Sequence, residues 1–270
     1  MSVPVSTKTP RKPNLDVEDG IEYPSSDGKP MGETGTHARV AMVSIYGVLD
    51  RYFMNNPRVA VHANMFMYYV KGDPKRNVCP DVFVARDVDN DYKRRSYKVW
   101  KEGKGPDVVF EVTSRKTRKQ DLTMKFEIYR DVLRVGEYFL FDPFEEYLDP
   151  SLQGYRLVAG SYEPILMIKG GMPSEVLGLE LQRFDVELKF YNPETSKLLP
   201  SMHELDREIE TRELARREAE VARREAEAAR LKEEVARREA EVARREAELE
   251  VQRLRREVEE LRRRLPEAEE

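Results

Sequence analysis

The sequence predicts an α/β domain followed by one long helix, and three observations support this prediction. Four runs rich in Val, Phe and Tyr have the composition of buried strands, at residues 59–70, 80–85, 107–112 and 136–141. Two segments, 36–53 and 119–133, place apolar residues at helical spacing. Residues 204–265 carry a seven-residue repeat, which is typical of a long helix rather than of a globular core.

In chain order the elements are a helix, three strands, a helix and a strand. Thr36 can cap the first helix, which runs to about Phe53 with a broad apolar face. The run at 59–70 predicts one bent strand or a hairpin. Short apolar runs punctuated by glycines follow at 144–191, and they predict added β-hairpins that cover one edge of the sheet. Residues 1–20 have no periodicity and predict a flexible N-terminus. The domain itself is expected at 21–200.

The helix at 119–133 is amphipathic and contains one lysine at the border of its apolar face. The residues predicted to face the sheet are Leu122, Phe126, Tyr129 and Leu133. Lys125 lies three residues after Leu122 and four before Tyr129, so it is expected to project toward the sheet.

Two carboxylates mark the ends of neighbouring predicted strands. Asp81 opens the strand at 80–85, and Glu111 interrupts an apolar run at 107–113. A carboxylate on a buried strand is costly unless it is paired, hydrogen-bonded or metal-bound. Spacing alone leaves two interpretations open, a metal site or a buried ion pair between Glu111 and Lys125 that binds nothing.

These motifs resemble the PD-(D/E)XK nuclease superfamily, and more narrowly its Uma-type branch of restriction endonucleases. The motifs are Pro80-Asp81, Glu111-Val-Thr-Ser114, the helix with an inward lysine, and Val135-Gly-Glu-Tyr-Phe-Leu-Phe-Asp-Pro143. The segments 23–37 and 173–180 are similar to the same branch, so the resemblance covers roughly residues 20–200. Thr113 stands where the superfamily usually has lysine, and the resemblance implies that Lys125 takes over that role from the following helix.

The resemblance implies a restriction-endonuclease-like core and a metal-dependent cleavage of DNA phosphodiester bonds. Asp81, Glu111 and the carbonyl of Val112 are the expected ligands of Mg²⁺, with Mn²⁺ as a possible substitute, since hard cations prefer oxygen ligands. Lys125 is then expected to orient or activate the attacking water and to offset phosphate charge. From another class, a catalytically inactive nuclease fold that serves as a binding module remains an alternative.

Two residues near the first helix are further candidates for the site. By resemblance, Glu33 can bring an extra carboxylate to the metal, although solvent-exposed capping is the alternative. His37 can contact phosphate or assist proton transfer, but a histidine at a helix start is often merely partly exposed.

Two basic segments are candidates for contact with DNA phosphates. One follows Glu111 directly and contains Arg115, Lys116, Arg118 and Lys119. The other, 93–101, interleaves basic residues with Tyr97 and Trp100, which are candidates for packing on a sugar or an exposed base.

Overall composition gives little support to nucleic-acid binding. Residues 204–270 hold 18 basic and 22 acidic residues, which leaves 29 of each in residues 1–203. The single cysteine, Cys79, excludes an intramolecular disulfide and fits a reducing compartment. No apolar run approaches the length of a membrane helix, and no signal peptide is visible, so a soluble cytoplasmic protein is expected.

The repeat in the tail begins with Ala215-Arg-Arg-Glu-Ala-Glu-Val221 and recurs, with small changes, at 222, 229, 236 and 243. Its alanines follow 4-3 spacing, and after Ala247 the apolar positions shift by one residue, a pattern that resembles a stutter. A coiled coil that makes the protein a homo-oligomer is the first interpretation. A lone charged helix is the second, because alanines bury little area.

Overall fold

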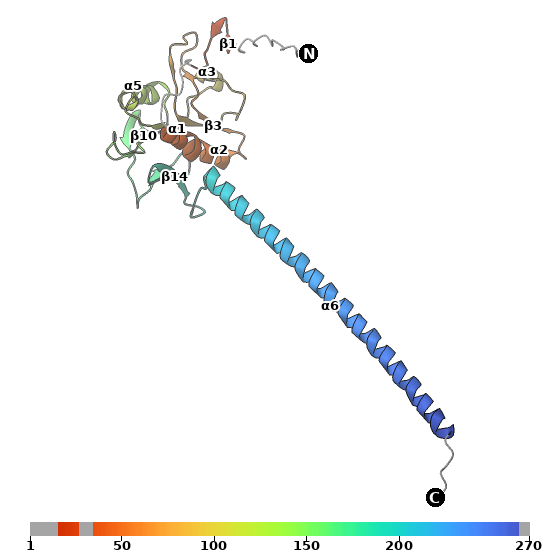
Figure 1. The fold of residues 1–270 in the computed structure, drawn as a ribbon. Coiled ribbons are helices and arrows are strands. Elements are labelled where there is room, and N and C mark those ends of the chain that lie inside the picture. Colours follow the sequence, from red (N-terminus) through yellow and green to blue (C-terminus); the bar gives the residue numbers. More distant parts are fainter. Residues whose placement is uncertain (1–15, 27–34, 265–270) are drawn as a thin grey trace, which may run out of the picture. The chain divides into compact units, whose positions relative to one another are not determined.

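The computed structural model describes residues 16–26 and 35–264, and it separates the chain into two compact units, 1–205 and 206–270 (Figure 1). The first unit is a mixed α/β domain, as the sequence predicts, and its strands form several separate sheets.

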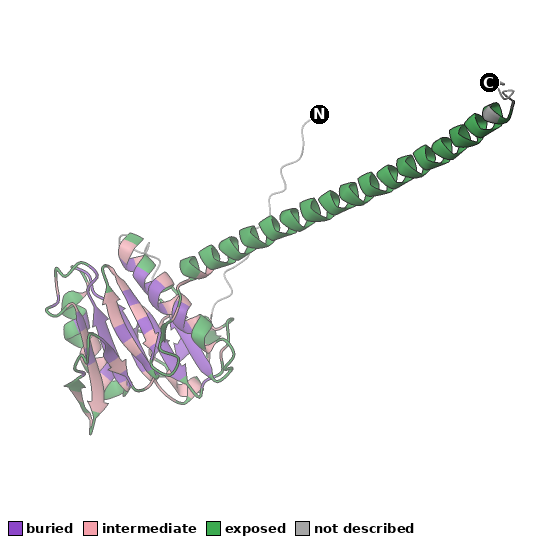
Figure 2. Cartoon of the chain, turned by 90° about the horizontal axis from the view of Figure 1, so that it is seen from below, coloured by how far each residue is buried: buried purple, intermediate pink, exposed green. Residues whose placement is uncertain are grey.

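A six-stranded sheet forms the centre of the first unit, in the order β11-β10-β9-β8-β6-β3. Its strands are β3 (Val59–Ala63), β6 (Val82–Arg86), β8 (Val108–Val112), β9 (Glu137–Phe141), β10 (Leu152–Val158) and β11 (Ser161–Pro164). Strands β8 and β9 pair in parallel, and the other neighbours pair antiparallel. All residues of β8 and β9 are buried, because both faces of the sheet are covered (Figure 2).

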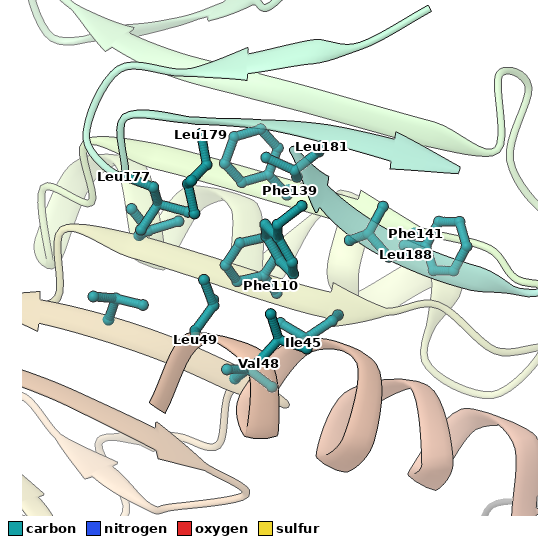
Figure 3. Close-up of a cluster of buried hydrophobic side chains, with 14 of the residues drawn as sticks. Ile45, Val48, Leu49, Phe110, Phe139, Phe141, Leu177, Leu179, Leu181 and Leu188 are labelled. Carbon is teal, nitrogen blue, oxygen red and sulfur yellow. The ribbon is translucent and has the colours of Figure 1, made fainter. Parts of the chain in front are cut away.

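One face of this sheet packs against the first helix and a second sheet. The helix runs as α1 (Gly35–Arg39), a π-helical segment η1 (Val40–Tyr46) and α2 (Gly47–Phe53). The second sheet has the order β12-β13-β14-β15, with strands β12 (Met172–Ser174), β13 (Leu179–Phe184), β14 (Glu187–Asn192) and β15 (Lys197–Leu198). Ile45 and Leu49 of the helix join Phe110 of β8 and Leu181 of β13 in one buried cluster (Figure 3).

A second buried cluster lies on the other face of the central sheet. It includes Phe83, Tyr129 and Tyr138, and α5 (Met124–Glu127) and η2 (Ile128–Val132) contribute side chains to it, whereas α4 (Arg118–Leu122) precedes them in the chain. A three-stranded sheet in the order β5-β4-β7 and two short elements complete this unit. Their bounds are β4 (Met67–Tyr68), β5 (Asn77–Val78), β7 (Tyr97–Lys98), α3 (Val99–Glu102), and a hairpin of β1 (Val17–Glu18) with β2 (Ile21–Glu22).

Several boundaries differ from those that the sequence predicts. The run at 59–70 divides into β3 and β4, which belong to different sheets, so it is neither one strand nor a hairpin. The region 144–191 contributes a hairpin at the sheet edge, as expected, but β13 and β14 also cover a face of the core. The β1–β2 hairpin begins inside the segment 1–20, which the sequence analysis leaves outside the domain.

The helix at 118–132 confirms the predicted helix, but not its predicted apolar face. Tyr129 and Leu133 are buried, and Phe126 packs at the border of the cluster, whereas Leu122 is 38% exposed. The reason is a break at Thr123, where φ is −126° and ψ is −90°. This break separates α4 from α5 and turns Leu122 away from the sheet.

The helix α6 (Met202–Arg264) confirms the long C-terminal helix, and its residues from Asp206 onward make up the second unit. From Asp206 onward every described side chain is exposed (Figure 2). Glu–Arg pairs four residues apart, such as Glu220 with Arg224 at 2.6 Å, support the helix along its length. Within the described residues, no helix is long and apolar enough to cross a membrane.

Candidate active site

The ends of β6 and β8 bring the two predicted carboxylates side by side. These strands pair antiparallel with Val82 opposite Phe110, so the register places Asp81 beside Glu111. Asp81 is half-buried, and its Oδ2 accepts a hydrogen bond of 2.7 Å from the backbone N–H of Val112. The contact that Val112 makes to Asp81 is therefore through its amide, whereas metal binding through its carbonyl stays a prediction.

Glu111 is 1% exposed, and both of its carboxylate oxygens accept hydrogen bonds. Lys125 Nζ donates to Oε2 at 2.8 Å, and the Tyr129 hydroxyl donates to Oε1 at 2.6 Å. The predicted projection of Lys125 toward Glu111 is therefore present. Tyr129, which the sequence analysis treats only as an apolar anchor, also holds Glu111 through its hydroxyl.

A third carboxylate, Asp121, was missed by the sequence analysis. It is fully buried, and its Oδ1 lies 3.0 Å from Lys125 Nζ as an ion pair. Neither of its oxygens accepts a well-directed hydrogen bond. Asp121, Lys125 and Tyr129 succeed one another at four-residue intervals, so they share a face of the helical segment. This spacing was the available signal, since a carboxylate four residues before an inward lysine is well placed to pair with it.

The buried charges of this site do not balance. The ammonium group of Lys125 pairs with Glu111 and Asp121, and Asp81 lies beside Glu111 in the strand register, so among these described residues one cation stands against three carboxylates. Burial raises the pKa of the Asp81 carboxyl, and it raises the pKa of Glu111 well above its usual range despite the attraction of Lys125. Burial alone would lower the pKa of Lys125, but the charges of Glu111, Asp121 and Asp81 outweigh it and raise that pKa. The lysine therefore stays protonated, and the site favours uptake of a further positive charge.

The donor set fits a hard divalent cation in its chemistry. Carboxylate oxygens are the ligands that Mg²⁺ prefers, and one or two of them suffice because water completes its coordination. The unsatisfied oxygens of Asp121 and the second lone pairs of Glu111 are available acceptors. Among the described residues, however, no three His, Cys, Asp or Glu side chains are already gathered around one point. The fit therefore rests on the charge and the donor chemistry, not on a preformed cage.

His37 lies at the end of β8, close to this site. Its Nε2 is 3.2 Å from the carbonyl oxygen of Thr113, and its ring centroid is 5.5 Å from that of Phe144. His37 is buried rather than partly exposed, and it connects the start of α1 to the strand end. Thr113, which occupies the usual lysine position of the superfamily, is fully buried. Glu33 lies outside the described residues.

The basic residues that follow β8 lie on the surface. Arg115, Lys116, Arg118 and Lys119 are all exposed, at the start of α4 and in the turn before it. They stand between Glu111 and Lys125 in the sequence. The chain therefore presents positive charge beside the carboxylate site.

The structure contradicts part of the expectation for the second basic segment, whereas phosphate contact by the exposed Lys93 and Arg95 stays a prediction. Tyr97 is fully buried, so it cannot stack on a base. Lys98 pairs with Asp16 at 2.6 Å, and Arg94 pairs with Glu102 at 3.0 Å. The indole of Trp100 donates to Glu18 at 3.2 Å. Asp16 and Glu18, from the N-terminal segment, are the partners of Lys98 and Trp100, and the local sequence of 93–101 gives no sign of them.

The fold and the site together define an α/β protein with a carboxylate–lysine cluster at the ends of two neighbouring strands. Residues 15–187 match the Uma2 family, which is described as putative restriction endonuclease, and the chain belongs to this family. The domain is also similar to the crystal structure of a putative nuclease belonging to DUF820 from Anabaena variabilis ATCC 29413. That comparison has 15% sequence identity, covers 59% of this chain and 80% of the other, and has a TM-score of 0.41. No curated protein matches the chain.

Proposed function

We propose that the chain is a metal-dependent endonuclease that hydrolyses DNA phosphodiester bonds. The observation that carries this proposal is the excess of buried negative charge where β6 and β8 meet, with one lysine among three carboxylates. Family membership supports the reaction class. Three strands of the central sheet, β3, β6 and β8, lie between the first helix and α4 in the chain, and β9 follows η2; this order supports a restriction-endonuclease-like core.

In this proposal Asp81 and Glu111 hold Mg²⁺ or Mn²⁺ together with the main-chain oxygen of Val112. A bound metal ion would neutralise phosphate charge and lower the pKa of a water molecule. Lys125, which remains protonated, would orient that water and stabilise the charge that develops on phosphorus. Asp121 positions Lys125 through their ion pair. A role for Glu33 or His37 at the metal or the phosphate stays a prediction.

The exposed basic residues after β8 are proposed to contact DNA phosphates. The carboxylates of the site, by themselves, would repel a phosphate backbone. The neighbouring basic residues would offset this repulsion, and they are Arg115, Lys116, Arg118 and Lys119. Such contacts carry no sequence information, so they predict binding that weakens steeply with salt.

One observation favours a second candidate, a nuclease fold that binds DNA without cutting it. Both oxygens of Glu111 already accept hydrogen bonds, from Lys125 and Tyr129, so the cluster is also consistent with a buried ion pair. Buried pairs of this kind serve structure in many proteins without any ligand.

Cleavage of supercoiled plasmid separates the two candidates. With Mg²⁺ or Mn²⁺ present, the full-length protein should nick the plasmid, and chelation should stop it. Asp81→Asn should lower the rate by about a hundredfold or more, the scale of losing one electrostatic group at a reacting centre. The exposed Asp131→Asn serves as the control and should cut normally. Binding of DNA without any metal-dependent cleavage would establish the binding module instead.

A further inference from the structure

The helix α6 presents an apolar stripe that nothing in the second unit covers. In heptad notation, Ala219 is at position a and Ala222 at position d, and the repeat keeps alanine at most of these positions from 215 to 247. Beyond Ala247 the stripe continues with larger side chains. Val251, Leu254, Val258 and Leu261 are each about half exposed, at 48%, 51%, 50% and 55%.

The charges that flank this stripe are sorted by sign. Position e is arginine throughout the repeat, at Arg216, Arg223, Arg230, Arg237 and Arg244. Position g is glutamate at Glu218, Glu225, Glu239 and Glu246, with Lys232 as the exception. The same sorting resumes after the phase shift, where Glu250 and Glu257 precede the stripe and Arg255 follows it. An isolated helix has no need to keep its two flanks opposite in sign.

The ion pairs within α6 leave these flanks largely unused. Glu213–Arg217, Glu220–Arg224 and Glu234–Arg238 join positions b and f, on the side of the helix away from the stripe. In the part of α6 that the structure describes, no ion pair is formed by the position-e residues Arg216, Arg223, Arg230 and Arg237 or by the position-g residues Glu218, Glu225, Glu239 and Glu246. The exceptions on the two flanks are Arg244, which pairs with Glu248 at 3.0 Å, and Glu250, which pairs with Arg253 at 3.8 Å. Charged residues on the outer face therefore pair within α6 itself. Most charged residues at positions e and g, on either side of the stripe, are left for ion pairs with a partner helix.

We propose that α6 pairs, parallel and in register, with α6 of a second copy of this chain. In a parallel pair, each position g faces position e of the next heptad of the other helix. Glu218 then meets Arg223 of the second copy, Glu225 meets Arg230, and Glu239 meets Arg244. An antiparallel pair would set glutamate against glutamate and arginine against arginine. The charges therefore select both the second copy as partner and its direction.

Two positions weaken the pair near its middle. Glu233 replaces alanine at position a, and Lys232 would face Arg237 of the second copy. With alanine at most other core positions, the association is weak and reversible, and the leucines beyond Ala247 contribute most of the buried area. Because the first unit is joined to the N-terminal end of α6, a parallel pair holds two such units at the same end. If the proposed function holds, this arrangement supplies two active sites for two DNA strands.

Sedimentation of the full chain over a concentration series tests the pairing. The wild type should pass from monomer to dimer as its concentration rises. The variant E218K/E225K/E239K turns three attractive contacts on each side of the dimer into repulsive ones. Even a twofold effect at each of these six contacts raises the dissociation constant by roughly sixty-fold. The variant E213K/E227K/E241K makes the same charge change at the outer position b and should dimerise nearly as the wild type does.

Disulfide cross-linking tests direction and register. Ala219→Cys places a thiol at position a, where a parallel, in-register pair brings the two copies together, so a covalent dimer should form on mild oxidation. Arg217→Cys, at the outer position f, is the matched control and should form little. In an antiparallel pair the thiols at 219 would lie tens of ångströms apart.

A wild type that stays monomeric at its highest soluble concentration would overturn the proposal and leave a single charged helix. Equal cross-linking at 217 and 219, or a dimer that the inner charge reversal does not weaken, would also overturn it. None of these measurements uses DNA or metal, so a failure here is distinct from a failure of the proposed nuclease.

Discussion

Replacing Lys125 by methionine should destabilise the first unit in a way that a second substitution largely repairs. Lys125→Met keeps the length of the side chain but removes the cation that pairs with both Glu111 and Asp121. Breaking a buried ion pair on one side costs more than removing both partners, because the remaining charge is left uncompensated. The double variant Lys125→Met/Glu111→Gln should therefore be more stable than the single one.

The loss of stability in Lys125→Met can be calculated from the protonation of Glu111. With its ammonium partner gone, the buried carboxylate can take up a proton, and its ordinary pKa is 4.5. Protonation at pH 7 then costs about 3 kcal/mol, at 1.36 kcal/mol for each pH unit, and this is an upper bound because burial already raises the pKa of Glu111 in the wild type. For a domain of this size, that corresponds to a fall in melting temperature of roughly 6–12 °C. Any further cost at Asp121 adds to this value and is not repaired by Glu111→Gln.

Tryptophan fluorescence is a suitable measure, because the chain has one tryptophan, Trp100, and it lies in the first unit. Thermal unfolding followed at this residue is insensitive to melting of α6. The exposed Lys119→Met, on the same helical segment, is the control and should melt within about 2 °C of the wild type. If Lys125→Met melts like this control, or if adding Glu111→Gln lowers the melting temperature further, the charge argument for this site is wrong.

Three further predictions concern metal, the tail and pH. Saturating Mg²⁺ should raise the melting temperature by about 5–10 °C, which corresponds to binding at a hundred times the dissociation constant, and a differential scanning calorimetry trace of Asp81→Ala should show no such shift. A chain that ends at Leu205 should keep the Trp100 unfolding transition and the metal response of the full protein, since that unit contains both buried clusters, and loss of either would show that α6 is needed for folding. Burial and the nearby charge of Arg94 lower the pKa of His62 to about 4. As pH falls, His62 therefore takes up a proton in the unfolded chain at a higher pH than in the folded one. The folded state loses stability as pH falls from about 6.5 toward 4. In urea unfolding, the free energy of unfolding should therefore fall between pH 7 and pH 5 by about 2 kcal/mol more in the wild type than in His62→Gln. An equal fall in both proteins would contradict the lowered pKa of His62.

The strands and the inward lysine were predictable because their signals are local. A strand of β-branched and aromatic residues, such as β8, is buried on both faces whichever partners it acquires. The position of Lys125 follows from helical spacing to Tyr129, which the structure keeps. The two carboxylates were predictable for a similar reason, since the opening of one strand and a charge within the next are visible in the sequence.

The errors have causes that are not local. Whether a basic residue is available to DNA depends on distant acids, and Lys98 meets Asp16 from a hairpin some eighty residues away. The exposure of Leu122 depends on the backbone break at Thr123, which no residue type demands. The strands of the second sheet were predicted only as hairpins at the edge of the central sheet. Short strands separated by glycines do not indicate which face of the core they pack against.

Asp121 shows how a site on a helix differs from a site on a strand. Successive residues of a strand point to opposite faces, so a lysine two residues after Glu111 would lie on the same face as this carboxylate. The strand would offer no further side chain of its own to hold the ammonium group of that lysine. A lysine on a helix has neighbours four residues away on the same face, and here these are Asp121 and Tyr129. A lysine on the helix therefore has a carboxylate, that of Asp121, to pair with its ammonium group. The same helical face also carries the Tyr129 hydroxyl, which donates a hydrogen bond to Glu111. This arrangement also makes the site more negative, which is the property on which the proposed binding of a metal ion depends.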